Sequence, residues 1–282
     1  MKKAAPIFYF KLVVFVLSCL LISGAAALSW AQETKPTKPP LNDKLLDSYR
    51  GKIEVSYILP RPAVIAEVLR KNKFVFTGRI APNKTDEYPG SAKAALNLGS
   101  RCTDGVMMIY GDSKASDQEL EELGAVIVKL TEDLGLKGNL KEIDQLKKAL
   151  KDKNQKEIKK SIDLLFAETG DFLRQRDDDD LAMLVSLGGW IELMYYASEE
   201  LSKNYQEQSS KVLAMAYIVD VYIKALDRLK IFVQDTPALA TISGRLPELK
   251  QLMQTPPNRP LSQEAVAGIF TIAKNLKQEI EK

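Results

Sequence analysis

Histidine is absent from the 282-residue sequence. This absence excludes the Ser-His-Asp and Cys-His arrangements of nucleophilic enzymes, histidine-dependent zinc sites, and a histidine switch near neutral pH. An enzyme made from this chain would have to use carboxylates, Lys, Tyr, Ser or a bound cofactor. No cofactor-binding fingerprint stands in the sequence. We therefore expect a protein that is not an enzyme and that has no cofactor and no metal site.

Cysteine is nearly absent, with Cys19 and Cys102 as its two examples. Cys19 lies in a segment that we expect to be removed, which leaves Cys102 alone and unable to form an intramolecular disulfide. Cys102 stands among apolar residues such as Leu98 and Val106. A thiol in such surroundings is more often an inert part of a core than a nucleophile.

The N-terminal segment has the layout of a secretory signal peptide. Three lysines flank the start of an apolar run at 12–28. Ser29 and Ala31 then place small residues at positions −3 and −1 of a cut before Gln32. We expect residues 1–31 to be a signal peptide and the mature protein to be exported, periplasmic or secreted.

Two alternatives to cleavage remain open. Cys19 follows Val16-Leu17-Ser18, which would suit a lipoprotein, although the most apolar half of the run would then follow the modified cysteine. An uncleaved segment would instead anchor the chain in a membrane by its N-terminus, although the run is slightly shorter than the ~20 residues that a spanning helix needs. In our interpretation the membrane is a partner only through this segment.

The charge of the mature chain argues against nucleic acid as a partner. The signal segment holds three lysines and no acid, so its removal leaves 37 of the 40 basic residues against 37 acidic ones. The net charge of the mature chain is therefore zero. A nucleic-acid-binding protein is typically basic, at least over one face.

The mature chain is predicted to be all-α. Residues 32–50 form a Pro/Lys-rich linker, and residues 51–282 form a single helical domain. Apolar residues recur there at spacings of three and four, over 120–134, 158–172, 215–233 and 265–276. This repeat is typical of helices in an antiparallel bundle or a helical stack. The proline-rich stretch 235–260 is expected to be a loop with one short helix at 247–253.

One predicted helix, residues 180–200, is apolar nearly all round, which indicates a buried central helix. It carries Ser186, Gly188 and Gly189 in its interior. Each interior glycine costs about 0.8–1 kcal/mol relative to alanine. We expect these three small residues to form a flat patch where another helix approaches closely. A phosphate-binding role is less favoured, because phosphate-binding glycines precede a helix.

A buried polar network is the second feature expected of this helix. Glu192 lies between Ile191 and Leu193, and a buried carboxylate needs a partner. Asn97, Arg101 and Asp104 are the candidates, since their spacings of four and three draw a polar line down an otherwise apolar helix. Our hypothesis pairs Arg101 with Glu192, with the other two completing the network. In the alternative, each of these polar residues faces water.

Trp190 and Tyr195 suggest an apolar pocket between helices, although aromatic residues on a buried helix are usually part of the core. Three functions follow from these features. The first is a non-enzymatic exported helical protein with a binding or interaction role in the bacterial cell envelope and an unknown protein partner. The second is a carrier of an apolar small molecule near Trp190 and Tyr195. The third and least favoured is a carboxylate-based enzyme using Glu192 and Asp104.

Three segments carry a resemblance to a protein family. They are "YILPRP" (57–62), "ALNLGSRCTD" (95–104) and "GGWIELMYY" (188–196). With its Leu-Pro-x-Pro, Ala-Leu-x-Leu-Gly and Gly-Gly-Trp-Ile-Glu segments, the chain resembles a family of uncharacterised exported bacterial proteins that are expected to be helical. The resemblance implies export and an all-helical fold, and it implies no activity, ligand or functional residue.

Overall fold

The computed structural model describes residues 85–282, apart from 111–115, 139, 230–235 and 257–258. The expected signal peptide (1–31), the linker (32–50), Cys19 and the Leu-Pro-x-Pro segment lie outside the described residues. The described helices all belong to one unit of the chain.

The described residues are helical, and no strand occurs among them. This confirms the all-α prediction. The longer helices are α4 (Ser91–Tyr110), α5 (Asp117–Asp133), α6 (Lys141–Lys151), α7 (Gln155–Gln175), α8 (Asp179–Lys203), α10 (Ala216–Leu226), α12 (Pro237–Met253) and α13 (Gln263–Glu281). A short α9 (Glu207–Ser210) and a 3-10 turn, η2 (Lys211–Leu213), lead from α8 to α10.

Side-chain caps fix where several of these helices begin. Ser116 forms a reciprocal capping box with Glu119 at the start of α5. The Asn154 side chain accepts a hydrogen bond from the backbone of Glu157 at the start of α7, and Ser262 does the same for Ala265 at the start of α13. Each cap satisfies a backbone N–H that has no partner within its helix.

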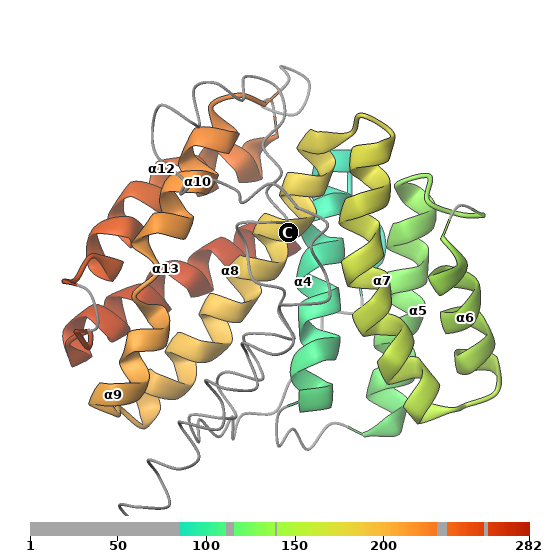
Figure 1. Ribbon diagram of the computed structural model, residues 1–282, viewed down its shortest axis with the longest axis horizontal. Coiled ribbons are helices and arrows are strands. Elements are labelled where there is room, and N and C mark those ends of the chain that lie inside the picture. Colours follow the sequence, from blue (N-terminus) through green and yellow to red (C-terminus); the bar gives the residue numbers. More distant parts are fainter. Residues whose placement is uncertain (1–84, 111–115, 139, 230–235, 257–258) are drawn as a thin grey trace, which may run out of the picture. The chain divides into compact units, whose positions relative to one another are not determined.

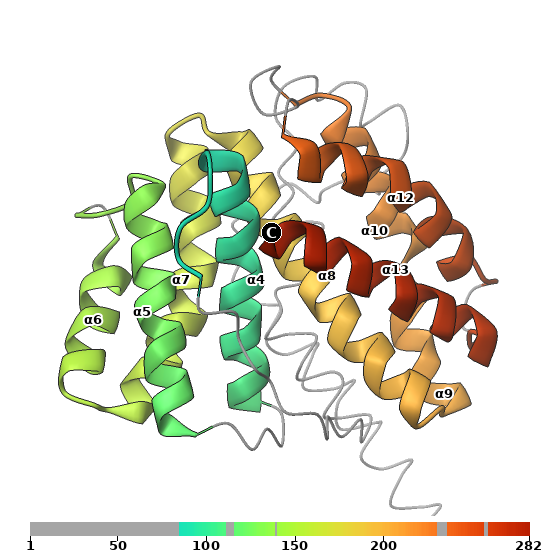
Figure 2. The same cartoon turned by 180° about the vertical axis from the view of Figure 1, so that it is seen from behind.

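Helix α8 is the buried central helix, as the sequence predicted. It packs most extensively against α4 and α13, and also against α7. Helices α5, α6 and α7 lie on one side of the α4–α8 contact, and α10, α12 and α13 lie on the other (Figures 1 and 2). By composition α8 is long and apolar enough to span a membrane, but 83% of its most apolar window is buried inside the protein. Its apolar character is therefore accounted for by the core that surrounds it.

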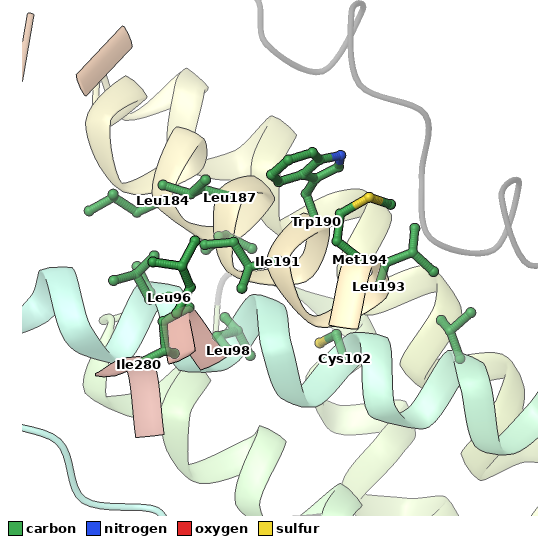
Figure 3. Close-up of a cluster of buried hydrophobic side chains, with 14 of the residues drawn as sticks. Leu96, Leu98, Cys102, Leu184, Leu187, Trp190, Ile191, Leu193, Met194 and Ile280 are labelled. Atoms are coloured by element: carbon green, nitrogen blue, oxygen red, sulfur yellow. The ribbon is translucent and has the colours of Figure 1, made fainter. Parts of the chain in front are cut away.

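The core around α8 draws on helices that are far apart in the sequence. Figure 3 shows Leu96 and Leu98 of α4 lying against Leu184 and Ile191 of α8. Ile280 from the end of α13 reaches the same cluster (Figure 3). These side chains are almost completely buried. The core thus joins the beginning, the middle and the end of the described chain.

The expected loop at 235–260 is wrong in its first half, and the short helix expected at 247–253 is the end of a longer one. Helix α12 runs from Pro237 to Met253, with Pro237 in its first turn and Pro247 in its interior. A proline is tolerated in the first turn, but an interior proline costs about 3 kcal/mol. Pro247 lies on the exposed side of the helix. Four buried aliphatic residues on the other side offset its cost, namely Leu239, Ile242, Leu246 and Leu249.

Candidate functional site

Helices α4 and α8 touch backbone to backbone at their glycines. A Cβ atom added to Gly188 would lie 1.9 Å from the carbonyl oxygen of Leu96, and one added to Gly99 would lie 1.8 Å from that of Val185. Both distances are far too short for a real side chain. A glycine on each helix is therefore what lets the two backbones approach. Sequence reasoning found Gly188 and missed its counterpart, Gly99.

The neighbouring small residues play different parts. A Cβ at Gly189 would lie 2.9 Å from Oγ1 of Thr103, and that hydroxyl lies 3.2 Å from the carbonyl oxygen of Gly189. Ser186 contacts another helix, since its Oγ lies 3.3 Å from the phenol oxygen of Tyr222 on α10. The structure therefore places Gly188 and Gly189 against α4, and it places Ser186 against α10.

Beside this glycine contact, polar side chains from three helices meet in the core. We call this group the three-helix cluster. It consists of Ser100, Arg101 and Asp104 of α4, Glu192 and Tyr196 of α8, and Lys277 and Glu281 of α13. The contacts Ser100–Glu192 and Asp104–Tyr196 advance together by four residues, so α4 and α8 run in the same direction here.

Glu192 lies at the centre of the cluster. Its carboxylate oxygen Oε2 accepts a hydrogen bond from the Ser100 hydroxyl at 2.5 Å. The other oxygen, Oε1, accepts one from Nζ of Lys277 at 2.6 Å. The side chain is 1% exposed. Both of its oxygens are therefore engaged by donors from two different helices.

Arg101 is fully buried and binds carboxylates from two helices. Its Nη2 lies 2.5 Å from Oε1 of Glu281, and its Nη1 lies 3.3 Å from Oδ2 of Asp104. The distance from Nη2 to Oε2 of Glu192 is 3.9 Å. The structure thus brings Arg101 and Glu192 together, but each has a closer partner on α13.

Asp104 and Asn97 complete the contacts around the cluster. The phenol of Tyr196 donates a hydrogen bond to Oδ1 of Asp104 at 2.6 Å. The Asn97 amide donates to the carbonyl oxygen of Ile280 at 2.6 Å. That carbonyl lies in the last turn of α13 and has no partner within its own helix. Asn97 therefore caps the C-terminal end of α13.

The cluster carries more negative than positive charge. Its carboxylates are Asp104, Glu192 and Glu281, and its cations are Arg101 and Lys277. Burial raises the pKa of Glu192, and the charge of Asp104 raises it further. Burial alone would lower the pKa of Lys277, but the neighbouring carboxylates, Glu192 first, outweigh it and hold the pKa above its usual value. The two cations therefore stay charged, and burial favours the protonated form of Glu192.

The cluster is nearly closed to solvent. Arg101 and Asp104 are completely buried, and the side chains of Lys277 and Glu281 are 15% and 21% exposed. A catalytic acid or base must reach the proton that it transfers. Asp104 and Glu192 instead face other side chains of the same cluster. Through these contacts they join α4, α8 and α13 inside the protein, and we call this arrangement the clamp.

Sequence reasoning identified Arg101, Asp104 and Glu192 and missed the members on α13. Lys277 and Glu281 are four residues apart on one helix and form an ion pair of 2.7 Å. Such a spacing is typical of exposed ion pairs on helix surfaces. Only their burial beside Arg101 marks them as part of the core. Ser100 and Tyr196 carried no signal, because small hydroxyls and aromatic residues are common in helical cores.

The two aromatic residues expected to line a pocket contact different helices. Trp190 lies on the side of α8 away from Leu96 (Figure 3), and its ring centroid lies 5.3 Å from that of Tyr222 on α10. The ring of Tyr195 lies 5.9 Å from Phe270 on α13. The indole nitrogen of Trp190 is buried and has no hydrogen-bond partner among the described residues.

Cys102 lies in the core next to the cluster. It is 1% exposed, and burial raises the pKa of its thiol. A thiol reacts as the thiolate, so this cysteine is unreactive in the folded protein. No group of three or more Cys, Asp or Glu side chains in the described part of the chain is placed to hold a metal ion.

Comparisons with protein families, curated proteins and solved structures find no match for this chain.

Proposed function

We propose that this is an exported, non-enzymatic helical protein with a binding or interaction role in the bacterial cell envelope. One observation carries the non-enzymatic part. The two carboxylates best suited to acid–base chemistry, Asp104 and Glu192, are buried and engaged by Tyr196, Ser100 and Lys277. In a chain without histidine, this leaves the buried carboxylates with a structural role.

Export is supported by the sequence of the N-terminal segment, with its lysines, its apolar run and the small residues before Gln32. The test is to express the protein with its own signal, recover it from the envelope fraction and weigh it by native mass spectrometry. A mature mass that begins at Gln32 supports export by cleavage. A full-length protein that stays in the cytoplasm contradicts it. A mass increased by lipid on Cys19 identifies a lipoprotein.

A second candidate is a carrier of an apolar small molecule held beside Trp190. The observation that favours it is the buried indole N–H, which has no hydrogen-bond partner in the part of the chain that the structure describes. A buried polar group without a hydrogen bond is costly, and a ligand with a hydrogen-bond acceptor would relieve this cost. The same native spectrum decides: extra small-molecule mass favours the carrier, and a bare mass favours the protein-interaction role. Trp30 leaves with the signal peptide, so the fluorescence of the mature protein reports on Trp190 alone.

A further inference from the structure

A group of exposed lysines lies at the turn between α6 and α7. Lys148 and Lys151 end α6, Lys153 is in the turn, and Lys156 begins α7; all four are exposed. We call them the turn lysines. Asp152 is the one acid between 148 and 156. None of the four forms an ion pair in the described structure.

Lysines elsewhere in the described chain are commonly paired. Lys129 pairs with Asp133, Lys203 with Glu199, and Lys250 with Asp220. The mature chain has no net charge, but the turn lysines form a local excess of positive charge. The acidic start of α5 limits this excess on one side, where Gln155 donates to Glu121 at 3.0 Å.

The backbone holds one of these lysines in an unfavourable conformation. Lys153 has a φ of +48° at the end of α6. The N–H of the next residue, Asn154, bonds to the carbonyl oxygen of Ala149 at 2.9 Å, which closes the helix. Glycine or asparagine is the usual residue at such a position, because other side chains crowd the backbone there. The turn thus carries a lysine where folding alone favours glycine.

The residue types of this segment indicate an anionic partner that is bound without fixed geometry. Protein–protein interfaces are enriched in Arg, Tyr and Trp and depleted in Lys. The stretch 141–160 has eight lysines and no Arg, Tyr or Trp. Lysine is a compact, strongly hydrated charge that suits attraction to a charged surface without fixed geometry. Clusters of about four to eight Lys or Arg residues beside a transmembrane helix or on an amphipathic helix bind anionic lipid surfaces in this way.

We propose that the turn lysines form a docking surface for anionic phospholipid headgroups. Helix α6 packs against α5 and α7 and lies at the edge of its group of helices (Figure 1), so its last turn faces outward. The proposal names a partner for the envelope role proposed above and rests on that role for the place where the membrane is met. The contact between the turn lysines and the lipid headgroups needs only the folded protein, so it can be tested separately from export.

The test is co-sedimentation with phosphatidylcholine vesicles that contain either no phosphatidylglycerol or about one third of it. The readout is the difference between the two, because an N-terminal apolar segment that was not removed would bind both kinds of vesicle. The wild type is expected to bind the anionic vesicles in low salt and to dissociate as the salt concentration rises, since salt screens exposed charges. Replacing Lys148, Lys151, Lys153 and Lys156 by Gln is expected to lower this binding about tenfold or more.

A matched control carries the same change in charge elsewhere, at the exposed lysines Lys137, Lys203, Lys274 and Lys282. It is expected to keep most of the binding. Equal losses in both variants, or no binding of the wild type to anionic vesicles, would overturn the proposal; in the second case an acidic protein becomes the partner to look for. Lys153→Gly separates binding from folding, because it is expected to keep or raise the melting temperature while weakening binding. Vesicle binding by a protein that is not exported would refute the envelope role alone.

Discussion

Glu192 and Lys277 are 85 residues apart in the sequence, and their side chains meet at 2.6 Å in the core. The contact joins the central helix α8 to the C-terminal helix α13. Through Lys277 and Arg101 the same network reaches Glu281 and α4. The ends of the described chain are thus held together by buried charges as well as by apolar packing. A buried ion pair that loses one partner leaves a charge uncompensated, which is why such clusters respond strongly to mutation.

Removal of a cation from the three-helix cluster is expected to destabilise the protein. Arg101→Met leaves three carboxylates to a single cation, Lys277, and we expect a loss of about 3–5 kcal/mol in the free energy of unfolding. The control is Arg245→Met, because Arg245 pairs with Glu248 at a half-exposed site. Exposed pairs contribute about 0–1 kcal/mol. Urea denaturation measures both values, and similar losses in the two variants would show that Arg101 is not a clamp.

The glycine contact between α4 and α8 is expected to tolerate no side chain. Gly188→Ala places a methyl group against the backbone of Leu96, so the helices must move apart. We expect a loss of at least about 2 kcal/mol, in the range that overpacked cores show. Gly244→Ala is the control, because nothing lies within 4 Å of its added Cβ. That change should stabilise α12 by up to about 1 kcal/mol. Destabilisation by both variants, measured by thermal unfolding, would contradict the specific contact.

Stability should decrease as pH rises through the folded pKa of Glu192. Burial and Asp104 raise this pKa above its ordinary value of 4.5. The folded chain therefore holds a proton that the unfolded chain has already released. The stabilisation is complete below about pH 4.5 and is lost as the folded protein releases the proton. The Glu192→Gln variant has no carboxyl group to titrate at this position. The difference in the free energy of unfolding between the wild type and this variant should therefore shrink as pH falls. A constant difference from pH 4 to 8 would exclude a raised pKa.

Cys102 should report the opening of the core. Its thiol is buried next to the α4–α8 contact, and burial raises its pKa. We expect no labelling by a thiol reagent in the folded protein and one rapid equivalent in urea. The measurement uses a Cys19→Ser background, so that an uncleaved signal segment adds no second thiol. Fast labelling of Cys102 under native conditions would mean that α4 separates from α8 without global unfolding.

How far the sequence predicts the structure differs from one element to another. The sequence predicts that α8 is buried, because apolar residues lie on nearly all of its faces. Helix α12 was not evident, because Pro237 and Pro247 resemble loop residues until the buried face of Leu239, Ile242 and Leu246 is seen. Proline restricts the local backbone, whereas the burial of a helix face depends on the tertiary fold. Local propensity alone therefore predicted the wrong element.

The three-helix cluster could likewise be predicted only in part. An arginine and an aspartate on an apolar helix, and a glutamate inside α8, indicate buried charges that need partners. Which partners they find depends on where α13 docks, and no local pattern in the sequence specifies that position. Lys277 and Glu281 were therefore indistinguishable from an exposed pair. The sequence indicates that a buried Glu192 needs a partner, but it does not identify Lys277 as that partner.

A double-mutant cycle on Glu192 and Lys277 tests the clamp between α8 and α13 most directly. Glu192→Gln, Lys277→Met and the double variant are compared with the wild type by urea denaturation at pH 7. If the pair joins the two helices, the effects of the two single changes on the free energy of unfolding are non-additive, with a coupling energy of about 1–3 kcal/mol. Additive effects, within about 0.3–0.5 kcal/mol, would show that the two residues act independently and would contradict the clamp.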